Sequence, residues 1–147
     1  MAHEDAGKYT AKHPQGTTLN ELIAKAIREK SSDRTLACAR GEQIALELHV
    51  GIAEVGRTAD LLEMKVKECQ LGLFGWGDKP KHGKDIPVTE VVSAETRSAL
   101  SKASLDGRVG CADLWQIANR LGLERKMISA ACEALGLKIQ SCQLGTF

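Results

Sequence analysis

The chain has 147 residues, of which 43% are hydrophobic and only 3% aromatic, and its formal net charge is +1. This length suits one ordinary domain or two very small ones, with a core built from aliphatic rather than aromatic side chains. No apolar run approaches the ~18 residues that a membrane-spanning helix needs, and a dedicated nucleic-acid binder is usually more basic than this chain.

The first predicted elements are a tail and a helix. Residues 1–17 are polar and lack the apolar central stretch of a secretory signal, so we expect a flexible tail and a cytoplasmic protein. Thr18 and Glu21 then form a capping-box pair at a helix start. Apolar residues follow at 19, 22, 23, 26 and 27, which is one helix face, and they predict a helix that fades by Asp33.

Two more helices and a strand are predicted next. The second helix runs from about 38 to 48, a break follows at 49–51, and the third helix runs from about 52 to 63. From Lys65 to Leu71 apolar and polar residues alternate, which predicts a short strand. Residues 75–92 contain two of the chain's three prolines and a basic run, so we expect a linker or a wing loop there.

The second half of the chain repeats the first at an offset of 73 residues. Asp33–Phe74 align with Asp106–Phe147 over 42 positions without a gap, and 14 pairs are identical. Chance would supply roughly 3 identical pairs. The predicted organisation is a tail at 1–17, a first repeat at 18–74, a linker or wing loop at 75–92 and a second repeat at 93–147. Ser93 is the expected cap of the first helix in the second repeat.

The second and third helices of each repeat resemble a helix-turn-helix. In the second repeat the resemblance is carried by Ile117, Ala118, Leu121, Gly122, Leu123 and Ile128. In the first repeat His49 replaces the turn glycine, and His tolerates the left-handed region better than most residues. With a preceding helix and a following strand, each repeat looks like a winged helix-turn-helix. The resemblance implies a mainly α fold with short β-strands in two tandem winged-helix-like repeats, with Ile86–Val88 as a candidate returning strand of a wing.

In such a fold the third helix places its N-terminal residues in the major groove of DNA. In the second repeat the exposed positions there would be Glu124, Arg125, Lys126, Ser129, Ala130 and Glu133. The resemblance therefore implies that the second repeat reads double-stranded DNA. The side chains expected to contact DNA are Arg125, Lys126, Ser129, Arg120, Arg57, Lys79, Lys81 and Lys84.

The first repeat is poorer in DNA-binding side chains. Its equivalent positions are Gly51, Ile52, Ala53, Gly56, Arg57 and Asp60, of which only Arg57 suits DNA. The apolar Ile52 and Ala53 favour docking against a protein partner, a second copy of the chain or the second repeat.

The best-preserved stretch is Cys69–Phe74 against Cys142–Phe147, and three interpretations of it stay open. It can pack the core of each repeat, it can form an interface in which the two repeated strands pair, or its cysteines can join Cys38 and Cys111 in a metal or redox site. The third interpretation lacks a Cys-x-x-Cys pattern and any histidine at ligand spacing. We therefore expect no cofactor.

The sequence favours a regulator over an enzyme. It contains no Gly-rich phosphate loop, no Gly-x-Ser-x-Gly and no His-Glu-x-x-His pattern. We expect a DNA-binding transcription regulator. The alternatives are a protein–protein interaction module on the same scaffold and a thiol-based metal-sensing or redox-sensing regulator.

Overall fold

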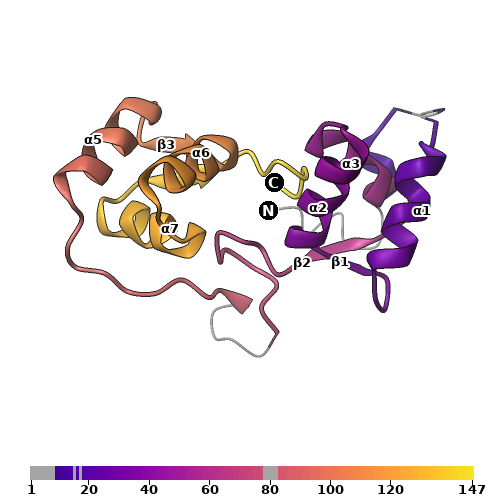
Figure 1. The fold of residues 1–147 in the computed structure, drawn as a ribbon, viewed down its shortest axis with the longest axis horizontal. Helices are drawn as coiled ribbons and strands as arrows, with labels where there is room; N and C mark the ends of the chain where they lie inside the picture. The colour runs from indigo at the N-terminus through magenta and orange to yellow at the C-terminus, as the bar shows by residue number, and fades with distance from the viewer. Residues whose placement is uncertain (1–8, 15, 17, 78–82) are drawn as a thin grey trace. The chain divides into compact units, whose positions relative to one another are not determined.

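The computed structural model describes residues 9–14, 16, 18–77 and 83–147. Over these residues the fold is mainly α-helical with short strands, which confirms the predicted class. The chain forms two compact units (Figure 1). Unit 1 comprises Met1–Cys69 together with Gln143–Phe147, and unit 2 comprises Gln70–Cys142.

Unit 1 contains three α-helices and two short strands among its described residues. Its elements are a 3₁₀-helix at Tyr9–Lys12, α1 at Glu21–Lys30, β1 at Thr35–Ala37, α2 at Cys38–Leu48, α3 at Ile52–Leu61 and β2 at Lys65–Lys67. The three helices pack on one another. The bounds of α2 match the prediction, and α3 ends two residues earlier than predicted.

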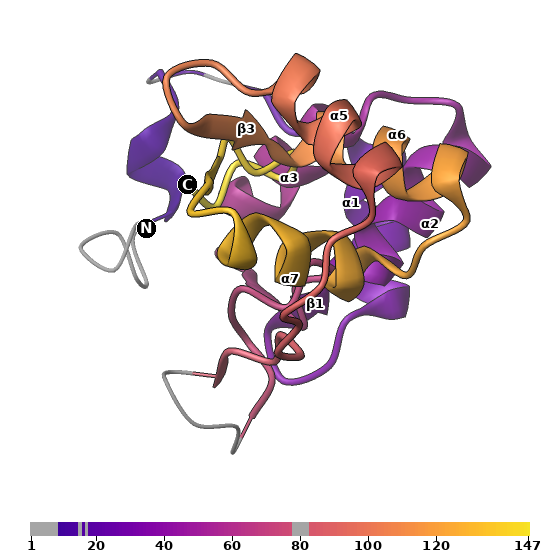
Figure 2. The same cartoon turned by 90° about the vertical axis from the view of Figure 1, so that its left-hand side faces the viewer.

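Unit 2 has the same order of helices and strands as unit 1. Figure 2 shows α5, β3, α6 and α7 of this unit. Its elements are α5 at Ala94–Ala103, β3 at Arg108–Gly110, α6 at Cys111–Leu121, α7 at Arg125–Ala134 and β4 at Lys138–Gln140. Each element starts 73 residues after its counterpart in unit 1, as α2 and α6 or β2 and β4 show. The structure therefore follows the repeat of the sequence element by element.

The strands pair in parallel within each repeat. Leu36 of β1 lies opposite Val66 of β2, and Val109 of β3 lies opposite Ile139 of β4, at repeat-equivalent positions. Of the three interpretations of the repeated segment, the one in which the two repeated strands pair with each other is therefore wrong. β1 and β3 were not predicted, and β2 covers only the first three residues of the strand predicted from Lys65 to Leu71.

Caps and turns follow local chemistry. Asn20, not Thr18, caps α1, because its side chain accepts from the Ile23 amide at 3.1 Å. Ser93 caps α5 as expected and accepts from the Thr96 amide at 3.1 Å. The turn after α2 has His49 at φ 54°, and the turn after α6 has Gly122 at φ 69°. The left-handed turn predicted for both helix pairs is confirmed.

The cores use equivalent positions in the two units. Ile27, Leu36, Ile44 and Val55 are fully buried in unit 1. Their counterparts Leu100, Val109, Ile117 and Ile128 are at most 5% exposed in unit 2. These side chains lie on facing sides of the three helices and the first strand, and their burial is the main stabilising contribution.

The compact units and the sequence repeats are divided at different places. Gln70–Phe74 ends the first repeat but belongs to unit 2, and Gln143–Phe147 ends the second repeat but belongs to unit 1. Leu71 and Leu144 are 1% and 3% exposed, so both segments are packed rather than frayed. The most strongly repeated stretch of the sequence is thus exchanged between the two units.

The expected wing has a different form. Ile86–Val88 is not a strand, and it belongs to unit 2 rather than unit 1. The amide of Trp76 donates to the Gly83 carbonyl at 3.0 Å, and the amide of Asp85 donates to the Gly72 carbonyl at 2.8 Å. Residues 72–77 and 83–86 therefore form a loop closed by backbone hydrogen bonds, called here the tied loop. Neither of its described arms is a strand, so the winged-helix character of the repeats stays a prediction.

Candidate nucleic-acid interface

The α6–α7 pair of unit 2 carries the cations on which the DNA prediction depends. Arg125 and Lys126 are the first two residues of α7, and Glu124 is its N-cap. Gly122 ends α6 in the left-handed conformation, so α7 can start only three residues later. This geometry places the two cations at consecutive positions at the start of α7.

Arg125 is held by an aromatic ring and an amide. Its guanidinium lies over the Trp115 ring, with Cζ 3.8 Å from the ring centroid. Its Nη1 donates to Oε1 of Gln70 at 2.9 Å. Stacking on an aromatic face and a directed hydrogen bond restrict the side chain, so less rotamer entropy remains to be lost when it contacts a ligand.

Lys126 is held by the tied loop. Its Nζ lies 2.6 Å from Oδ2 of Asp85 and 3.6 Å from the centroid of the Trp76 ring. Gly72 allows this approach, because it has φ +80° and a Cβ built there would lie 2.4 Å from the Asp85 carbonyl oxygen. A glycine is required at this crossing of the two arms.

The other predicted reading positions of α7 are not open. Ser129 is fully buried and Ala130 is 2% exposed, so the expectation that they lie on an exposed face is wrong. The Ser129 hydroxyl instead donates to the Arg125 carbonyl at 3.4 Å. Glu133 forms an ion pair with Lys84 of the tied loop. The face of α7 predicted to read DNA is therefore covered, in part by the tied loop.

The remaining predicted cations lie elsewhere. Arg120 is exposed near the end of α6 in unit 2. Arg57 is in unit 1, on α3, where its Nη2 lies 3.4 Å from Oε1 of Glu54. Lys79 and Lys81 lie outside the described residues. Among the described candidates, the structure brings Lys84, Arg125 and Lys126 to one helix of unit 2.

The corresponding helix of unit 1 is also covered. A Cβ built at Gly56 of α3 would lie 2.2 Å from the carbonyl oxygen of Leu144. A Cβ built at Gly41 of α2 would lie 3.2 Å from both Leu144 methyl groups. The two glycines form a groove into which the chain's last segment fits with its backbone and one leucine.

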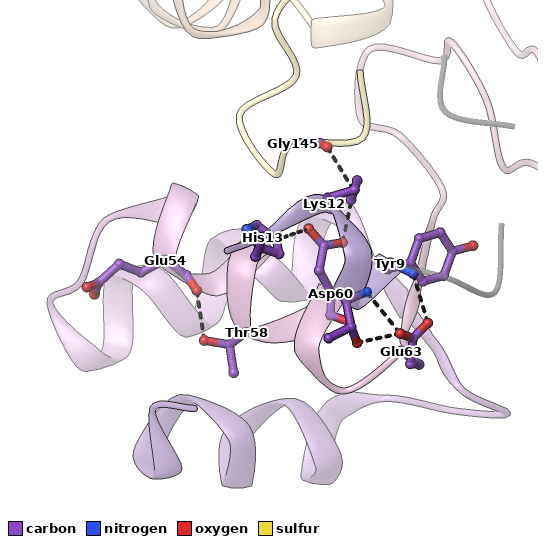
Figure 3. Close-up of polar contacts among 9 residues, drawn as sticks. Tyr9, Lys12, His13, Glu54, Thr58, Asp60, Glu63 and Gly145 are labelled. Atoms are coloured by element: carbon purple, nitrogen blue, oxygen red, sulfur yellow. Dashed lines mark hydrogen bonds and ion pairs between the residues drawn. The ribbon is translucent and has the colours of Figure 1, made fainter. Parts of the chain in front are cut away.

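An ion-pair network completes this cover in unit 1 (Figure 3). Asp60 of α3 is 6% exposed, and its carboxylate lies 3.1 Å from Nζ of Lys12 and 2.7 Å from Nε2 of His13. Lys12 also donates to the Gly145 carbonyl at 3.1 Å. Because a buried carboxylate without partners is costly, this network ties the N-terminal segment and the C-terminal segment to α3.

All five cysteines lie among the described residues, and no disulfide joins them. Cys38 and Cys69 belong to unit 1, and Cys111 and Cys142 belong to unit 2. Within the described part of the chain, no group of three or more His, Cys, Asp or Glu side chains is placed to hold a metal ion. Burial, with a smaller effect of the Glu133 charge, raises the pKa of Cys132 to about 12, so this thiol stays protonated at neutral pH.

Sequence reasoning missed four residues of this cluster: Gln70, Trp76, Asp85 and Trp115. The two tryptophans carried a usable signal, because they are the only ones in the chain and each lies against one of the two adjacent cations. Gln70 lies in the best-preserved repeated stretch, but the repeat did not indicate its partner, and Asp85 carried no signal.

Comparison with protein-family models, curated proteins and solved structures finds no match for this chain. None of the helices that the structure describes has both the length and the apolar character needed to span a membrane.

Proposed function

We propose that the protein is a cytoplasmic DNA-binding transcription regulator in which unit 2 binds double-stranded DNA through the start of α7 and the tied loop. The observation that carries the proposal is the pair of adjacent cations Arg125 and Lys126 at the start of α7, with Lys84 held against the same helix. Arg125 and Lys126 are the first two residues of α7, and Lys84 of the tied loop contacts the same helix through Glu133, next to its last residue. Lys and Arg supply affinity for phosphates, and Arg also reads guanine.

The charge distribution supports unit 2 as the DNA-binding unit. Gln70–Cys142 carry ten Lys or Arg and eight Asp or Glu, a net charge of +2, whereas the rest of the chain has a net charge of −1. In unit 1 the position equivalent to Lys126 is Ala53, and the one equivalent to Arg125 is Ile52. The two units have diverged at the first two residues of this helix, where base contacts are made in such folds.

The direct test removes both cations of α7. Arg125→Ala combined with Lys126→Ala should weaken binding to mixed-sequence duplex DNA by about 1–3 kcal/mol per lost contact. Fluorescence anisotropy of a labelled duplex at constant salt measures the change.

The matched control is Lys25→Ala with Arg28→Ala on α1, which removes two exposed cations from unit 1. It should leave the affinity within about twofold of the original, because these side chains lie outside unit 2. Equal losses in both double variants would mean that binding is not located at α7.

A second function has a specific observation in its favour. Leu22 of α1 and Leu46 of α2 are 73% and 69% exposed in unit 1. Large exposed apolar side chains of this kind favour a protein partner or a second copy of the chain. Sedimentation of the Leu22→Ser, Leu46→Ser double variant checks this candidate: a dimer of the natural chain that becomes a monomer supports it, and identical profiles count against it.

A further inference from the structure

Asp85 occupies the place at Lys126 that a DNA phosphate would take. Its Oδ2 lies 2.6 Å from Nζ of Lys126, which is a charge-assisted hydrogen bond. A lysine that contacts DNA directs the same ammonium group to a phosphate oxygen. One ammonium group on one face of a helix therefore has two anionic partners that exclude each other.

The tied loop holds Asp85 in this position through its backbone. The Asp85 amide donates to the Gly72 carbonyl at 2.8 Å, and Trp76 at the other end of the loop donates to Gly83 at 3.0 Å. Trp76 also covers Lys126, with its ring centroid 3.6 Å from Nζ. Asp85 and Trp76, the two partners of Lys126, are therefore joined by the backbone hydrogen bonds of one loop.

The ion pair lies close enough to the surface to be exchanged. The side chains of Lys126 and Asp85 are 29% and 33% exposed, so water screens the pair. Lys84, beside Asp85 in the tied loop, makes a second contact with α7 through Glu133. The tied loop therefore engages a cation and an acid of α7 that the helix-turn-helix resemblance placed on the exposed face of this helix.

We infer that the tied loop is an intramolecular brake on nucleic-acid binding, in which Asp85 competes with DNA phosphates for Lys126. This inference rests on the proposed function. The natural chain then binds DNA with the Asp85 carboxylate and the Trp76 ring moved away from Lys126, while Lys84 of the tied loop stays available to a phosphate. Part of the binding free energy is spent on breaking the Asp85–Lys126 and Trp76–Lys126 contacts. A ligand or partner that draws the tied loop away from α7 raises the affinity for DNA.

The first measurement is the DNA affinity of Asp85→Asn. We expect an increase of about tenfold at constant salt, which equals about 1.4 kcal/mol. The control is Asp106→Asn, the same charge change at an exposed turn residue of unit 2 with φ 51°, a conformation that Asn accepts. It should raise the affinity by about twofold or less, through net charge alone. Asp85→Ala gives a second route if the asparagine variant does not fold.

The second measurement follows the tied loop itself. Trp115→Phe leaves Trp76 as the only tryptophan, and it removes an indole N–H that has no acceptor among the described residues. In this background, DNA binding should shift Trp76 emission to longer wavelength as the ring leaves Lys126 and meets water. Asp85→Asn should produce part of this shift without DNA. In the reverse variant, Trp76→Phe, the emission of Trp115 reports on Arg125 alone and should not respond to Asp85→Asn.

The two measurements distinguish failure of the proposed inhibition by Asp85 from failure of the proposed DNA binding. If the natural chain binds DNA through Arg125 and Lys126 but Asp85→Asn matches Asp106→Asn and leaves Trp76 emission unchanged, the brake is overturned and the proposed function stands. If neither the natural chain nor Asp85→Asn binds DNA at low salt, the proposed function fails and the brake fails with it. Tight binding by Asp85→Asn beside weak binding by the natural chain supports both.

Discussion

At the scale of single residues, Gly56 shows how closely the last segment of the chain is fitted to unit 1. The carbonyl oxygen of Leu144 lies where a side chain at position 56 would begin. The equivalent residue in unit 2 is Ser129, which is fully buried and has a Cβ, so this position is glycine only in unit 1. Gly56 is in the interior of α3, where a glycine is otherwise unfavourable.

Gly56→Ala should destabilise the full chain by about 2 kcal/mol or more, because the new methyl group meets backbone atoms that cannot move cheaply. In a chain without Gln143–Phe147 the same substitution should stabilise α3 by about 0.5–1 kcal/mol, through helix propensity alone. Urea unfolding followed by circular dichroism measures both values.

A suitable control for Gly56→Ala is Gly51→Ala, where a Cβ has no neighbour within 4 Å. Its cost should be limited to the cap position, at about 0.5 kcal/mol. Equal destabilisation by Gly56→Ala with and without the last five residues would show that Leu144 does not occupy this groove.

His49 shows what single residues can and cannot predict. The turn after α2 could be predicted, because the second repeat has glycine at the same place and the helix-turn-helix needs a left-handed residue there. The buried state of Ser129 could not be predicted, because its exposure depends on which segment covers α7. Local backbone preferences are encoded near a residue, whereas burial depends on residues far away in the sequence.

At the scale of elements, the start of the 3₁₀-helix Tyr9–Lys12 is held by the carboxylate of Glu63, while Asp60 holds its end through Lys12. Glu63, just after α3, accepts hydrogen bonds from the amides of Tyr9 and Thr10, both at 2.9 Å, and from the Thr10 hydroxyl. These bonds, that of the Thr10 hydroxyl first, lower the pKa of Glu63 below its ordinary value of 4.5. The charged carboxylate is therefore the form that holds this element.

This arrangement predicts a specific pH dependence. Because the pKa of Glu63 is lower in the folded chain, its stabilising effect is complete above pH 4.5 and is lost as the pH falls through the folded pKa. In NMR spectra the amide signals of Tyr9 and Thr10 should shift together, with a midpoint below 4.5. Glu63→Gln should abolish this titration, and a midpoint at or above 4.5 would contradict the hydrogen-bonded geometry.

Most helices and strands could be predicted from the sequence, but the segments that pack against them could not. Periodicity located all the main helices, since their apolar faces pack within one unit. The strands β1 and β3 lead directly into the helices α2 and α6, and no alternating run like that from Lys65 to Leu71 marks them. The repeated Cys-Gln-Leu-Gly segment was recognised as important, but a repeat specifies only that two segments have the same environment. The repeat does not show that each of these segments packs in the unit formed by the other repeat's helices.

At the scale of the whole molecule, the repeated segment and the diverged helix are parts of one arrangement. Each unit contains the last segment of the other repeat. In each unit the face of the third helix that the resemblance assigned to DNA is covered. Unit 1 covers α3 with Leu144 and the ion pairs of Asp60. Unit 2 keeps two adjacent cations at the start of α7, each against a tryptophan. This difference supports different roles for the two units.

The most direct test of the central proposal is the salt dependence of DNA binding by the natural chain. If Arg125, Lys126 and Lys84 each neutralise one phosphate, the logarithm of the association constant should fall against the logarithm of salt concentration with a slope of about −2.7. Anisotropy titrations of a mixed-sequence duplex between about 50 and 300 mM salt measure this slope. A slope near zero, or no binding at the lowest salt, would contradict the account.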